Sequence, residues 1–391
     1  MKKLALLSLA LFCMLSLQAQ NKLFNVDYYG HLYFVSSVNG QPAHLLFDTG
    51  SPYVCLDSIF FENSTYKYKS LGNATMGGSG NNKVTVKIIM GELTFTIGDE
   101  QFRSTISPIV PLKPIVGDYV DGILGISEIK HKAMVIDYKN KKMGFYDKLE
   151  ESDIKGYTAL PLRFENNRFY VTLTVAVNNE IEIKGEYLVD IGNAGSINLT
   201  SAVAKKYSLE NLSPLMYCKM DNGGIGGEST DATFRGESIK IGPFELKKPV
   251  MEFSFNTGGA LADKEYAGLI GNEVLERFDV IIDPVGKKLY LKPNADFSKP
   301  FNPPTRGFVY TDRSKTLGYW VVNGVYKDSN ADKAGLKNGD RITAINGRSV
   351  KEISFQEQRT TLFKDLNGVA LDVERGNQQL HLSFDFDQPK I

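Results

Sequence analysis

Short segments of alternating apolar and polar residues, rich in β-branched and aromatic side chains, follow one another from Lys22 to about Tyr146. This pattern predicts strands, for example over residues 31–35, 83–89 and 92–97. Gly, Asn or Asp residues separate the strands, and the pairs Asn39-Gly40 and Gly98-Asp99 are typical of hairpin turns. The first third of the chain is therefore predicted to be an all-β lobe.

The chain then repeats this arrangement. In the first half Asp48 ends an apolar strand, Gly-Ile-Leu-Gly follows at 122–125, and two more strands are predicted at 135–138 and 143–146. The second half has the same order, with its members at Asp190, 268–271, 280–284 and 288–291. Because the order and spacing are kept, we predict two lobes of common origin, spanning residues 20–150 and 151–296.

Each half also carries a glycine cluster between its aspartate and its Gly-aliphatic-aliphatic-Gly motif. The clusters are formed by Gly77, Gly78 and Gly80 in the first half and by Gly223, Gly224, Ile225, Gly226 and Gly227 in the second. Glycine at this density permits positive φ angles, which suits a loop that moves or lets backbone approach a ligand. A simple hairpin tip is the alternative.

A third unit, residues 297–391, follows a stiff Pro-containing connector at 297–304. It has about the length of a small domain. The sequence predicts a helix near 354–363 and two closing strands at 370–374 and 380–386.

The N-terminus predicts a secretory signal peptide over residues 1–19, with two lysines, an uncharged apolar run and cleavage after Ala19. Cys13 lies inside this run, but Phe12 precedes it where a lipoprotein signal has a small residue. No later stretch reaches the ~20 apolar residues of a membrane helix. We expect a periplasmic or secreted protein with no integral membrane segment in its mature chain.

Charge and cysteine content narrow the function further. Lys plus Arg and Asp plus Glu each number 45, so no basic field favours nucleic acid as a partner. The mature chain keeps Cys55 and Cys218, which could form one disulfide in an oxidising compartment or remain free, buried thiols. A cysteine nucleophile would need a histidine partner, and none of the four histidines lies in a recognisable pairing context.

The two aspartates carry the candidate chemistry. A buried Asp that ends an apolar strand must be hydrogen-bonded or must share its charge. If the two turns meet, Asp48 and Asp190 can hold one proton between them, and their apparent pKa values separate. One carboxylate could then act as general base on a water while the other donates a proton to a peptide carbonyl. This chemistry requires no metal and no cofactor.

The sequence Asp48-Thr49-Gly50-Ser51, with the downstream 123–125, resembles an active-site half of the aspartic peptidases, and 223–227 resembles a flap of retroviral-type proteases. The resemblance covers about residues 24–293, with the lobe count of pepsin and the lobe size of retropepsins. It implies a mainly β fold of two pseudo-symmetric lobes and an endopeptidase that cuts extended polypeptides. The site residues that it implies are the catalytic pair Asp48 and Asp190, supported by Thr49, Gly50, Ser51, Ile191, Gly192 and Asn193.

The second half departs from the family pattern at Ile191, where the family has Thr or Ser. Those hydroxyls bond across to the opposing turn, so we expect Thr49 alone to brace the site, at a cost of about 1–3 kcal/mol for an unsatisfied partner. Three alternatives to an active peptidase stay open: an inactive protease-like protein that binds peptides, a carbohydrate-binding or scaffold protein of the cell envelope, and two aspartates that only cap turns. Contact between the two carboxyls would count against the scaffold.

The third unit resembles a PDZ domain, an α+β fold. Leu317-Gly318-Tyr319 resembles the carboxylate-binding loop, and the Ala-Gly-Leu at 334–336 with the Asn-Gly-Asp-Arg-Ile at 338–342 resembles the domain's core. The resemblance implies a C-terminal peptide as ligand, added as a strand beside residues 320–322. Trp320 is either part of this peptide site or part of the core, and the unit could also pack on the lobes with an empty groove.

Overall fold

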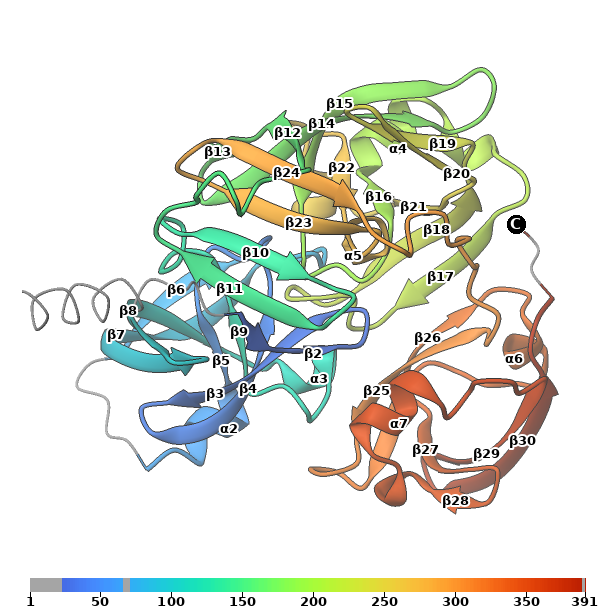
Figure 1. The fold of residues 1–391 in the computed structure, drawn as a ribbon. Helices are drawn as coiled ribbons and strands as arrows, with labels where there is room; N and C mark the ends of the chain where they lie inside the picture. Colours follow the sequence, from blue (N-terminus) through green and yellow to red (C-terminus); the bar gives the residue numbers. More distant parts are fainter. Residues whose placement is uncertain (1–22, 66–70, 389–390) are drawn as a thin grey trace, which may run out of the picture.

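The computed structural model describes residues 23–65, 71–388 and 391, which form two β lobes and a C-terminal unit (Figure 1). The fold is mainly β, as the alternating pattern predicts. The predicted signal peptide, with Cys13, lies outside the described residues. Among the described residues, no helix is both long and apolar enough to cross a membrane.

Lobe 1 is built on an eight-stranded sheet in the order β2-β3-β4-β9-β5-β8-β7-β6. Its elements are β1 (Phe24–Asn25), β2 (Asp27–Tyr28), β3 (Leu32–Val38), β4 (Gln41–Phe47), β5 (Cys55–Asp57), α2 (Ser58–Glu62), β6 (Leu71–Met76), β7 (Val84–Ile97), β8 (Glu100–Val110), α3 (Lys113–Val116), β9 (Gly122–Leu124), β10 (Ala133–Asp137) and β11 (Lys142–Tyr146).

Two details of lobe 1 test the strand pattern. The turn at Asn39-Gly40 has positive φ at both residues, 47° and 84°, as a hairpin turn of this type requires. The predicted separate strands at 83–89 and 92–97 are wrong, because β7 runs through both. Its pairing register with β8 shifts between Met90 and Leu93, so a β-bulge absorbs the break in alternation.

Lobe 2 repeats the plan of lobe 1. Its elements are β12 (Thr158–Pro161), β13 (Arg163–Glu165), β14 (Arg168–Ala176), β15 (Glu182–Val189), β16 (Ile197–Leu199), α4 (Ser201–Lys206), η1 (Leu209–Asn211), β17 (Met216–Met220), β18 (Ser229–Arg235), β19 (Ser238–Ile241), β20 (Phe244–Lys247), β21 (Val250–Ser254), η2 (Ala260–Ala262), β22 (Gly268–Ile270), α5 (Asn272–Leu275), β23 (Phe278–Asp283) and β24 (Lys288–Pro293).

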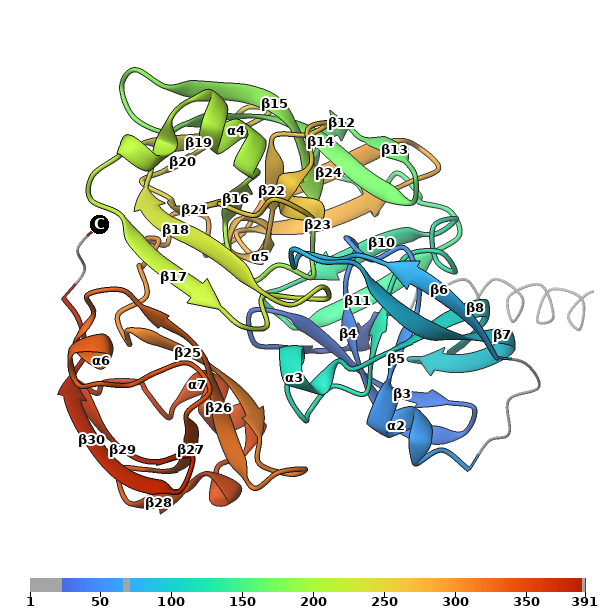
Figure 2. The ribbon, with the colours of Figure 1, turned by 180° about the vertical axis from the view of Figure 1, so that it is seen from behind.

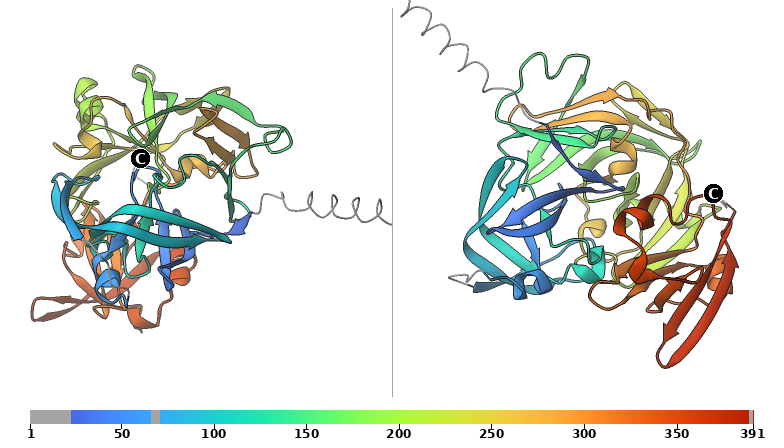
Figure 3. Two further views of the ribbon diagram at one scale, coloured as in Figure 1. Left: turned by 90° about the vertical axis from the view of Figure 1, so that its left-hand side faces the viewer. Right: turned by 60° about the horizontal axis from the view of Figure 1, so that its bottom comes forward.

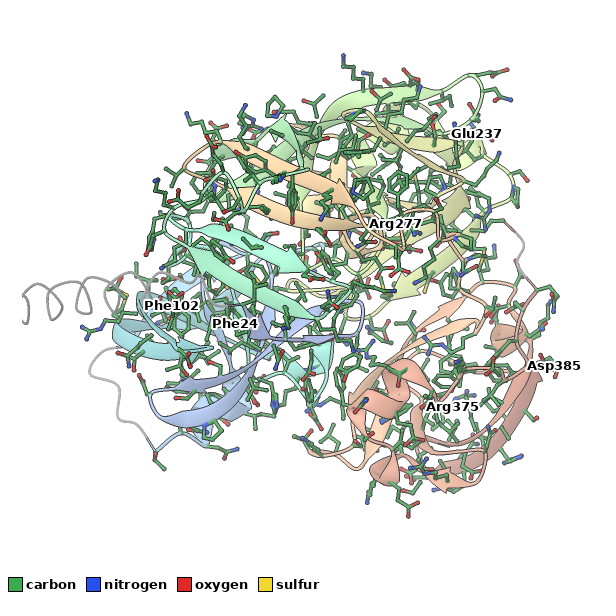
Figure 4. The ribbon with its side chains drawn as sticks, in the orientation of Figure 1. Phe24, Phe102, Glu237, Arg277, Arg375 and Asp385 are labelled. Atoms are coloured by element: carbon green, nitrogen blue, oxygen red, sulfur yellow. The ribbon has the colours of Figure 1, made fainter. Side chains whose placement is uncertain are left out.

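A six-stranded sheet, β1-β11-β10-β23-β24-β12, joins the lobes. Each lobe contributes the two strands that follow its Gly-aliphatic-aliphatic-Gly motif. In the centre of the sheet, β10 of lobe 1 pairs antiparallel with β23 of lobe 2. Apolar side chains from this sheet and from both lobes form one continuous core. Phe24 of β1 and Phe102 of β8, both labelled in Figure 4, pack on Phe145 within it. The lobes therefore share a rigid base.

The C-terminal unit has its own core around Trp320, which is fully buried and stacks on Tyr310 with ring centroids 4.4 Å apart. Arg375, labelled in Figure 4, donates to the carboxylate of buried Asp340 at 2.6 and 2.7 Å. The elements are β25 (Phe308–Arg313), β26 (Tyr319–Tyr326), α6 (Asn330–Lys333), β27 (Arg341–Ile345), β28 (Arg348–Ser349), η3 (Val350–Glu352), α7 (Phe355–Thr360), β29 (Gly368–Arg375) and β30 (Gln378–Asp385). Helix α7 and the two closing strands confirm the predicted order.

The C-terminal unit packs on both lobes (Figure 3). Its strand β26 pairs antiparallel with β17 of lobe 2, from Cys218↔Tyr326 to Met220↔Gly324, so one sheet continues across the domain junction. On lobe 1, the ring of Phe355 stacks on that of Tyr119, with centroids 3.9 Å apart. The unit is thus fixed against the two lobes rather than tethered by its connector alone.

Candidate active site

The two aspartates occupy equivalent places at the ends of paired strands. Strand β4 runs parallel to β9 and ends at Phe47, and the Asp48 N–H donates to Leu124 O at 3.0 Å. Strand β15 runs parallel to β22 in the same way, and the Asp190 N–H donates to Ile270 O at 3.0 Å. The Gly-aliphatic-aliphatic-Gly motifs therefore hold the aspartate turns in place.

The two turns meet, and each places its glycine against the opposing carboxyl group. A Cβ on Gly50 would lie 2.9 Å from Asp190 Oδ1, and a Cβ on Gly192 would lie 2.4 Å from Asp48 Cγ. Real Cβ atoms do not approach this closely, so only glycine fits at these two positions. Each carboxyl group therefore lies against the opposing aspartate turn, and the two carboxyl groups influence each other's pKa. This proximity counts against the scaffold alternative.

The two carboxyl groups differ in the number of backbone N–H groups that donate to them. Asp48 Oδ1 accepts from the N–H groups of Gly50 and Ser51 at 2.8 and 3.0 Å. Asp190 Oδ1 accepts from Gly192 N–H at 2.9 Å. Donors to a carboxylate favour its charged form, so the better-supplied Asp48 is the more acidic partner.

The pKa values of the pair follow from this inequality. Burial raises the pKa of both groups, and the backbone donors counteract the rise at Asp48. Burial and then the charge of Asp48 raise the pKa of Asp190 well above its ordinary value. The two carboxyl groups therefore titrate as a pair, in which the pKa of Asp190 is raised further than that of Asp48.

Thr49 braces the junction between the turns. Its buried hydroxyl donates to Val189 O at 2.6 Å and accepts from the Ile191 N–H at 2.9 Å. Ile191 is also fully buried and offers no hydroxyl in return. The expectation that Thr49 alone supplies the cross-turn hydroxyl is confirmed by this geometry.

Asn272, which the sequence reasoning missed, ties the second turn to its surroundings. Its Nδ2 donates to Ile191 O at 2.7 Å and to Gly30 O at 2.8 Å, while its Oδ1 accepts from Tyr138 Oη at 2.8 Å. The available signal was a side-chain amide directly after the 268–271 motif.

The outer residues of the turns close them locally. Ser51 Oγ donates to Tyr53 O at 3.0 Å, and Asn193 Oδ1 accepts from Gly195 N–H at 2.8 Å. Ser51 and Asn193 therefore support the turns, as predicted, while their part in catalysis stays a prediction.

Two further charged or titratable residues lie near the pair at the starts of matching strands: His31 directly precedes β3, and Arg168 is the first residue of β14. The Arg168 guanidinium lowers the pKa of both Asp48 and Asp190. Burial, and then the charge of Arg359, lowers the pKa of His31 to about 4. A residue-by-residue alignment of the two halves would have singled out this pair.

The two glycine clusters meet at the tips of their hairpins, β6–β7 and β17–β18 (Figure 2). Gly80 N–H donates to Ile225 O at 3.0 Å, Asn82 N–H to Gly226 O at 3.0 Å, and Ser79 Oγ to Gly223 O at 3.1 Å. We call residues 77–83 the first flap and 221–228 the second flap. Both predicted glycine clusters therefore belong to one contact, which joins the lobes.

The flaps also reach into the lobes that they cross to. Ile225 of the second flap packs on a lobe 1 cluster that includes Cys55 and Ile123. Asn81 of the first flap accepts from Thr257 N–H in lobe 2 at 2.8 Å. Gly226 and Gly227 adopt φ of 104° and 87°, which explains the glycines at this tip.

The thiols take no part in this chemistry. Cys55 and Cys218 are free and buried, so the disulfide that the sequence left open does not form. Burial raises the pKa of each thiol to about 12. Within the described residues no cluster of His, Cys, Asp or Glu side chains has the arrangement of a metal site.

Comparison with known families agrees with the site geometry. Residues 35–127 match a family model described as aspartyl protease, and residues 321–359 match one described as PDZ domain. The chain contains an aspartyl protease domain and a PDZ domain. The first match includes Asp48, the first flap and Gly125, whereas Asp190 lies outside it and is placed by the internal repeat and by the contact between the turns.

Two further comparisons were made. Among solved structures, the crystal structure of aspartic proteinase from Irpex lacteus is similar to this chain, with 15% identity and a TM-score of 0.48, and the match covers 72% of this chain and 100% of that one. No curated protein matches the chain.

The hydrogen bonds of the PDZ domain contradict the peptide site that the sequence predicts at residues 317–322. The N–H groups of Leu317 and Gly318 already donate to Arg313 O at 2.8 and 3.1 Å, so they are not a free nest for a carboxylate. Trp320 pairs with Asp312 on one edge and with Ile342 on the other. A peptide strand beside 320–322, contacting Tyr319 and Trp320, is therefore wrong, because β26 has no free edge there.

Proposed function

We propose that the chain is an endopeptidase in which Asp48 and Asp190 hydrolyse peptide bonds with an activated water. The observation that carries the proposal is the meeting of two aspartate turns, where each carboxyl group lies against the glycine of the opposing turn and Thr49 bridges the two. An aspartyl protease domain accounts for the first of these turns. Asp48 is the base and Asp190 the acid, because the pKa of Asp190 is raised further.

The proposed reaction begins with Asp48 as a carboxylate and Asp190 as a protonated carboxyl group. The Asp48 carboxylate takes a proton from water as the water oxygen bonds to the peptide carbonyl carbon, and Asp190 gives its proton to the carbonyl oxygen. In the second step the resulting tetrahedral carbon expels the amine. The amine nitrogen takes the proton held by Asp48, and a hydroxyl proton of the tetrahedral carbon returns to Asp190. The C–N bond breaks and the one-proton pair is restored.

The substrate we propose is an extended polypeptide, held as a strand beneath the flaps. The two flap tips are hydrogen-bonded to each other through Gly80, Asn82 and Ser79. In this closed state the joined flaps would block entry of a polypeptide from their side. Admission of a polypeptide chain therefore requires these bonds to open, together with those that tie Asn81 of the first flap to Glu228 and Thr257.

A peptide library incubated with the purified chain from pH 3 to pH 7.5, followed by mass spectrometry, tests the proposal. We expect internal cuts that disappear in Asp48→Asn and in Asp190→Asn. Asp283→Asn is the matched control, because Asp283 ends a strand of the same lobe and its Oδ1 accepts from Gly286 N–H, which an asparagine can also do. Peptide binding without turnover in the wild type would instead make the chain an inactive protease-like binding protein.

For the PDZ domain we propose a peptide C-terminus as ligand, bound beside β25 rather than β26. Support comes from a cavity of about 370 Å³ lined by Phe308, Phe363 and Leu366, with Arg306 at its wall. The Arg306 guanidinium lies 4.7 Å from the Phe363 ring centroid and could meet a carboxylate at the mouth of this cavity. Anisotropy titration should show that amidating the peptide, or Arg306→Ala, removes binding, whereas Arg341→Ala does not.

We also propose that the mature chain acts in the periplasm or outside the cell. The support is the sequence of the first 19 residues, with its lysine pair, apolar run and Gln18-Ala19-Gln20 ending. N-terminal sequencing of the protein from separated cell fractions tests this. A mature protein that begins at Gln20 outside the cytoplasm is the expected result, and an intact Met1 in the cytoplasm would refute it.

A further inference from the structure

We propose that Asn323 of the PDZ domain is a positioning residue for the second flap and, through it, for the closed flap pair. The inference rests on the proposed function for its kinetic part only. Asn323 lies on β26, in a different domain from both aspartates, and nothing in the aspartyl protease match includes it.

The Asn323 side chain holds the base of the second flap by two bonds. Its Oδ1 accepts from Asn222 N–H at 2.8 Å, and its Nδ2 donates to Asn222 O at 2.9 Å. The Asn323 backbone O accepts from Asp221 N–H at 3.0 Å. The side chain is 5% exposed, so water does not replace these partners.

The chemistry explains why an amide stands at this position. Asn222 directly precedes Gly223, where the flap leaves the β17–β26 ladder. A side-chain amide can accept from an N–H and donate to a C=O of the same residue, as an opposing strand would. Asn323 therefore continues the ladder by one residue beyond its backbone pairing and fixes the direction in which the glycine-rich tip departs.

The second flap, which Asn323 anchors, is hydrogen-bonded in turn to the first flap. Gly226 O and Ile225 O in the second flap accept from Asn82 and Gly80 in the first. A shift of the Asn222 backbone moves these acceptors relative to the first flap. The PDZ domain therefore influences the position of the first flap through the Asn323 amide, the short second flap and the hydrogen bonds between the two flap tips.

Hydrogen–deuterium exchange tests the anchor without any substrate. In Asn323→Leu we expect at least tenfold faster exchange at the amides of segment 221–228 and also at 80–82 in the first flap. Asn338→Leu is the matched control, because Asn338 donates to Lys219 O and to the side chain of Asp221 at the foot of the second flap, each at 3.0 Å, and its loss leaves both bonds from Asn323 to Asn222 in place. Unchanged exchange in Asn323→Leu, or equal acceleration in both variants, would overturn the proposal.

Kinetics of the full chain provide a second readout. Asn323→Leu should lower kcat/KM about tenfold, mainly through KM, while Asn338→Leu stays within about twofold. A fall confined to kcat with unchanged KM would contradict a role in holding the flap over substrate. If the wild type cuts no peptide, the proposed function fails, while the exchange experiment still decides the anchor.

Asn323→Asp distinguishes positioning from a general loss of packing. A carboxylate there can accept from Asn222 N–H but cannot donate to Asn222 O, whereas the protonated carboxyl can do both. We expect the variant's kcat/KM, relative to wild type at each pH, to rise at least threefold as pH falls from 7 to 4.5. A ratio independent of pH would overturn the proposal, including when Asn323→Leu does not fold.

Discussion

Thr49 and Ile191 stand opposite each other where the two aspartate turns meet, but only Thr49 carries the hydroxyl that links them. Thr49 Oγ1 contacts Val189 O and Ile191 N, 2.6 and 2.9 Å away. One side chain therefore satisfies a donor and an acceptor of the opposing turn. The second turn depends on the first more than the first depends on the second.

Thr49→Val should lower the free energy of unfolding by about 1–3 kcal/mol, because it leaves a buried carbonyl and a buried N–H without their partner. Urea denaturation monitored by circular dichroism measures this. Ile191→Val is the matched control, which removes one methylene at the facing position and should cost about 0.5–1.5 kcal/mol. An equal or smaller loss in Thr49→Val would contradict the bracing role.

Arg168→Ala should move the pH profile of peptide hydrolysis to higher pH on both limbs. Arg168 favours the charged forms of Asp48 and Asp190, so its removal raises the pKa of both carboxyl groups. The acidic limb, where Asp48 loses its proton, and the basic limb, where Asp190 loses its proton, then shift together. Arg163→Ala in the same hairpin should leave the profile in place, and a shift of one limb alone would refute the shared effect.

Glu252→Gln should stabilise the chain at pH 8 and not at pH 4.5. Burial, and then the charge of Asp231, raises the pKa of Glu252 from 4.5 to about 7. The folded chain thus keeps a proton that the unfolded chain releases, and stability falls as pH rises through this window. The gain at pH 8 should be about 1–3 kcal/mol by thermal or urea unfolding.

Glu245→Gln is the control for this pH dependence. Glu245 is only partly buried, and its hydrogen bond with Lys247 lowers its pKa, so the sign of its linkage is opposite. The Glu245 variant should gain no stability as pH rises. A stabilisation of the Glu252 variant that is equal at pH 4.5 and pH 8 would contradict the raised pKa.

Asp118→Ala should loosen the PDZ domain from lobe 1. Buried Asp118 accepts from Arg313 Nε at 2.9 Å and from Thr316 N–H at 2.7 Å. Removing the carboxylate leaves the Arg313 charge buried, which costs about 3–5 kcal/mol. Asp118→Asn, which keeps one acceptor oxygen, should cost less. Equal urea midpoints for both variants and the wild type would show that the junction contributes nothing.

The sequence was sufficient to predict the lobes and their aspartate turns because both are encoded locally. An apolar strand, an aspartate, a glycine and a later Gly-aliphatic-aliphatic-Gly motif occur twice in one order, and each glycine meets the opposing carboxyl as the spacing requires. The missing hydroxyl at Ile191 could be read directly. Asn272, His31 and Arg168 were missed because they lie outside the aspartate turns in the sequence, and only the fold brings them to the site.

The peptide edge of the PDZ domain could not be predicted for a related reason. The sequence around Leu317 and Gly318 fits a carboxylate loop in isolation, and only the partners of β26 decide against it. Two of these, β25 and β27, occupy both edges of the strand at Trp320. Which strand fills an edge depends on tertiary pairing, which the local sequence does not mark. The anchoring role of Asn323 could not be predicted either, because β17, which brings the second flap to it, lies about a hundred residues earlier in lobe 2.

The most direct test of the unequal carboxyl pair is a ¹³C NMR titration of aspartate-labelled protein, with Asp48→Asn and Asp190→Asn used for assignment. We predict that Asp48 and Asp190 titrate as a coupled pair, with Asp190 protonated well above the ordinary range of a carboxyl group. The Asp190 resonance should return toward that range in Asp48→Asn, because the neighbouring charge is gone. Two independent titrations near pH 4, unchanged in either variant, would contradict the account.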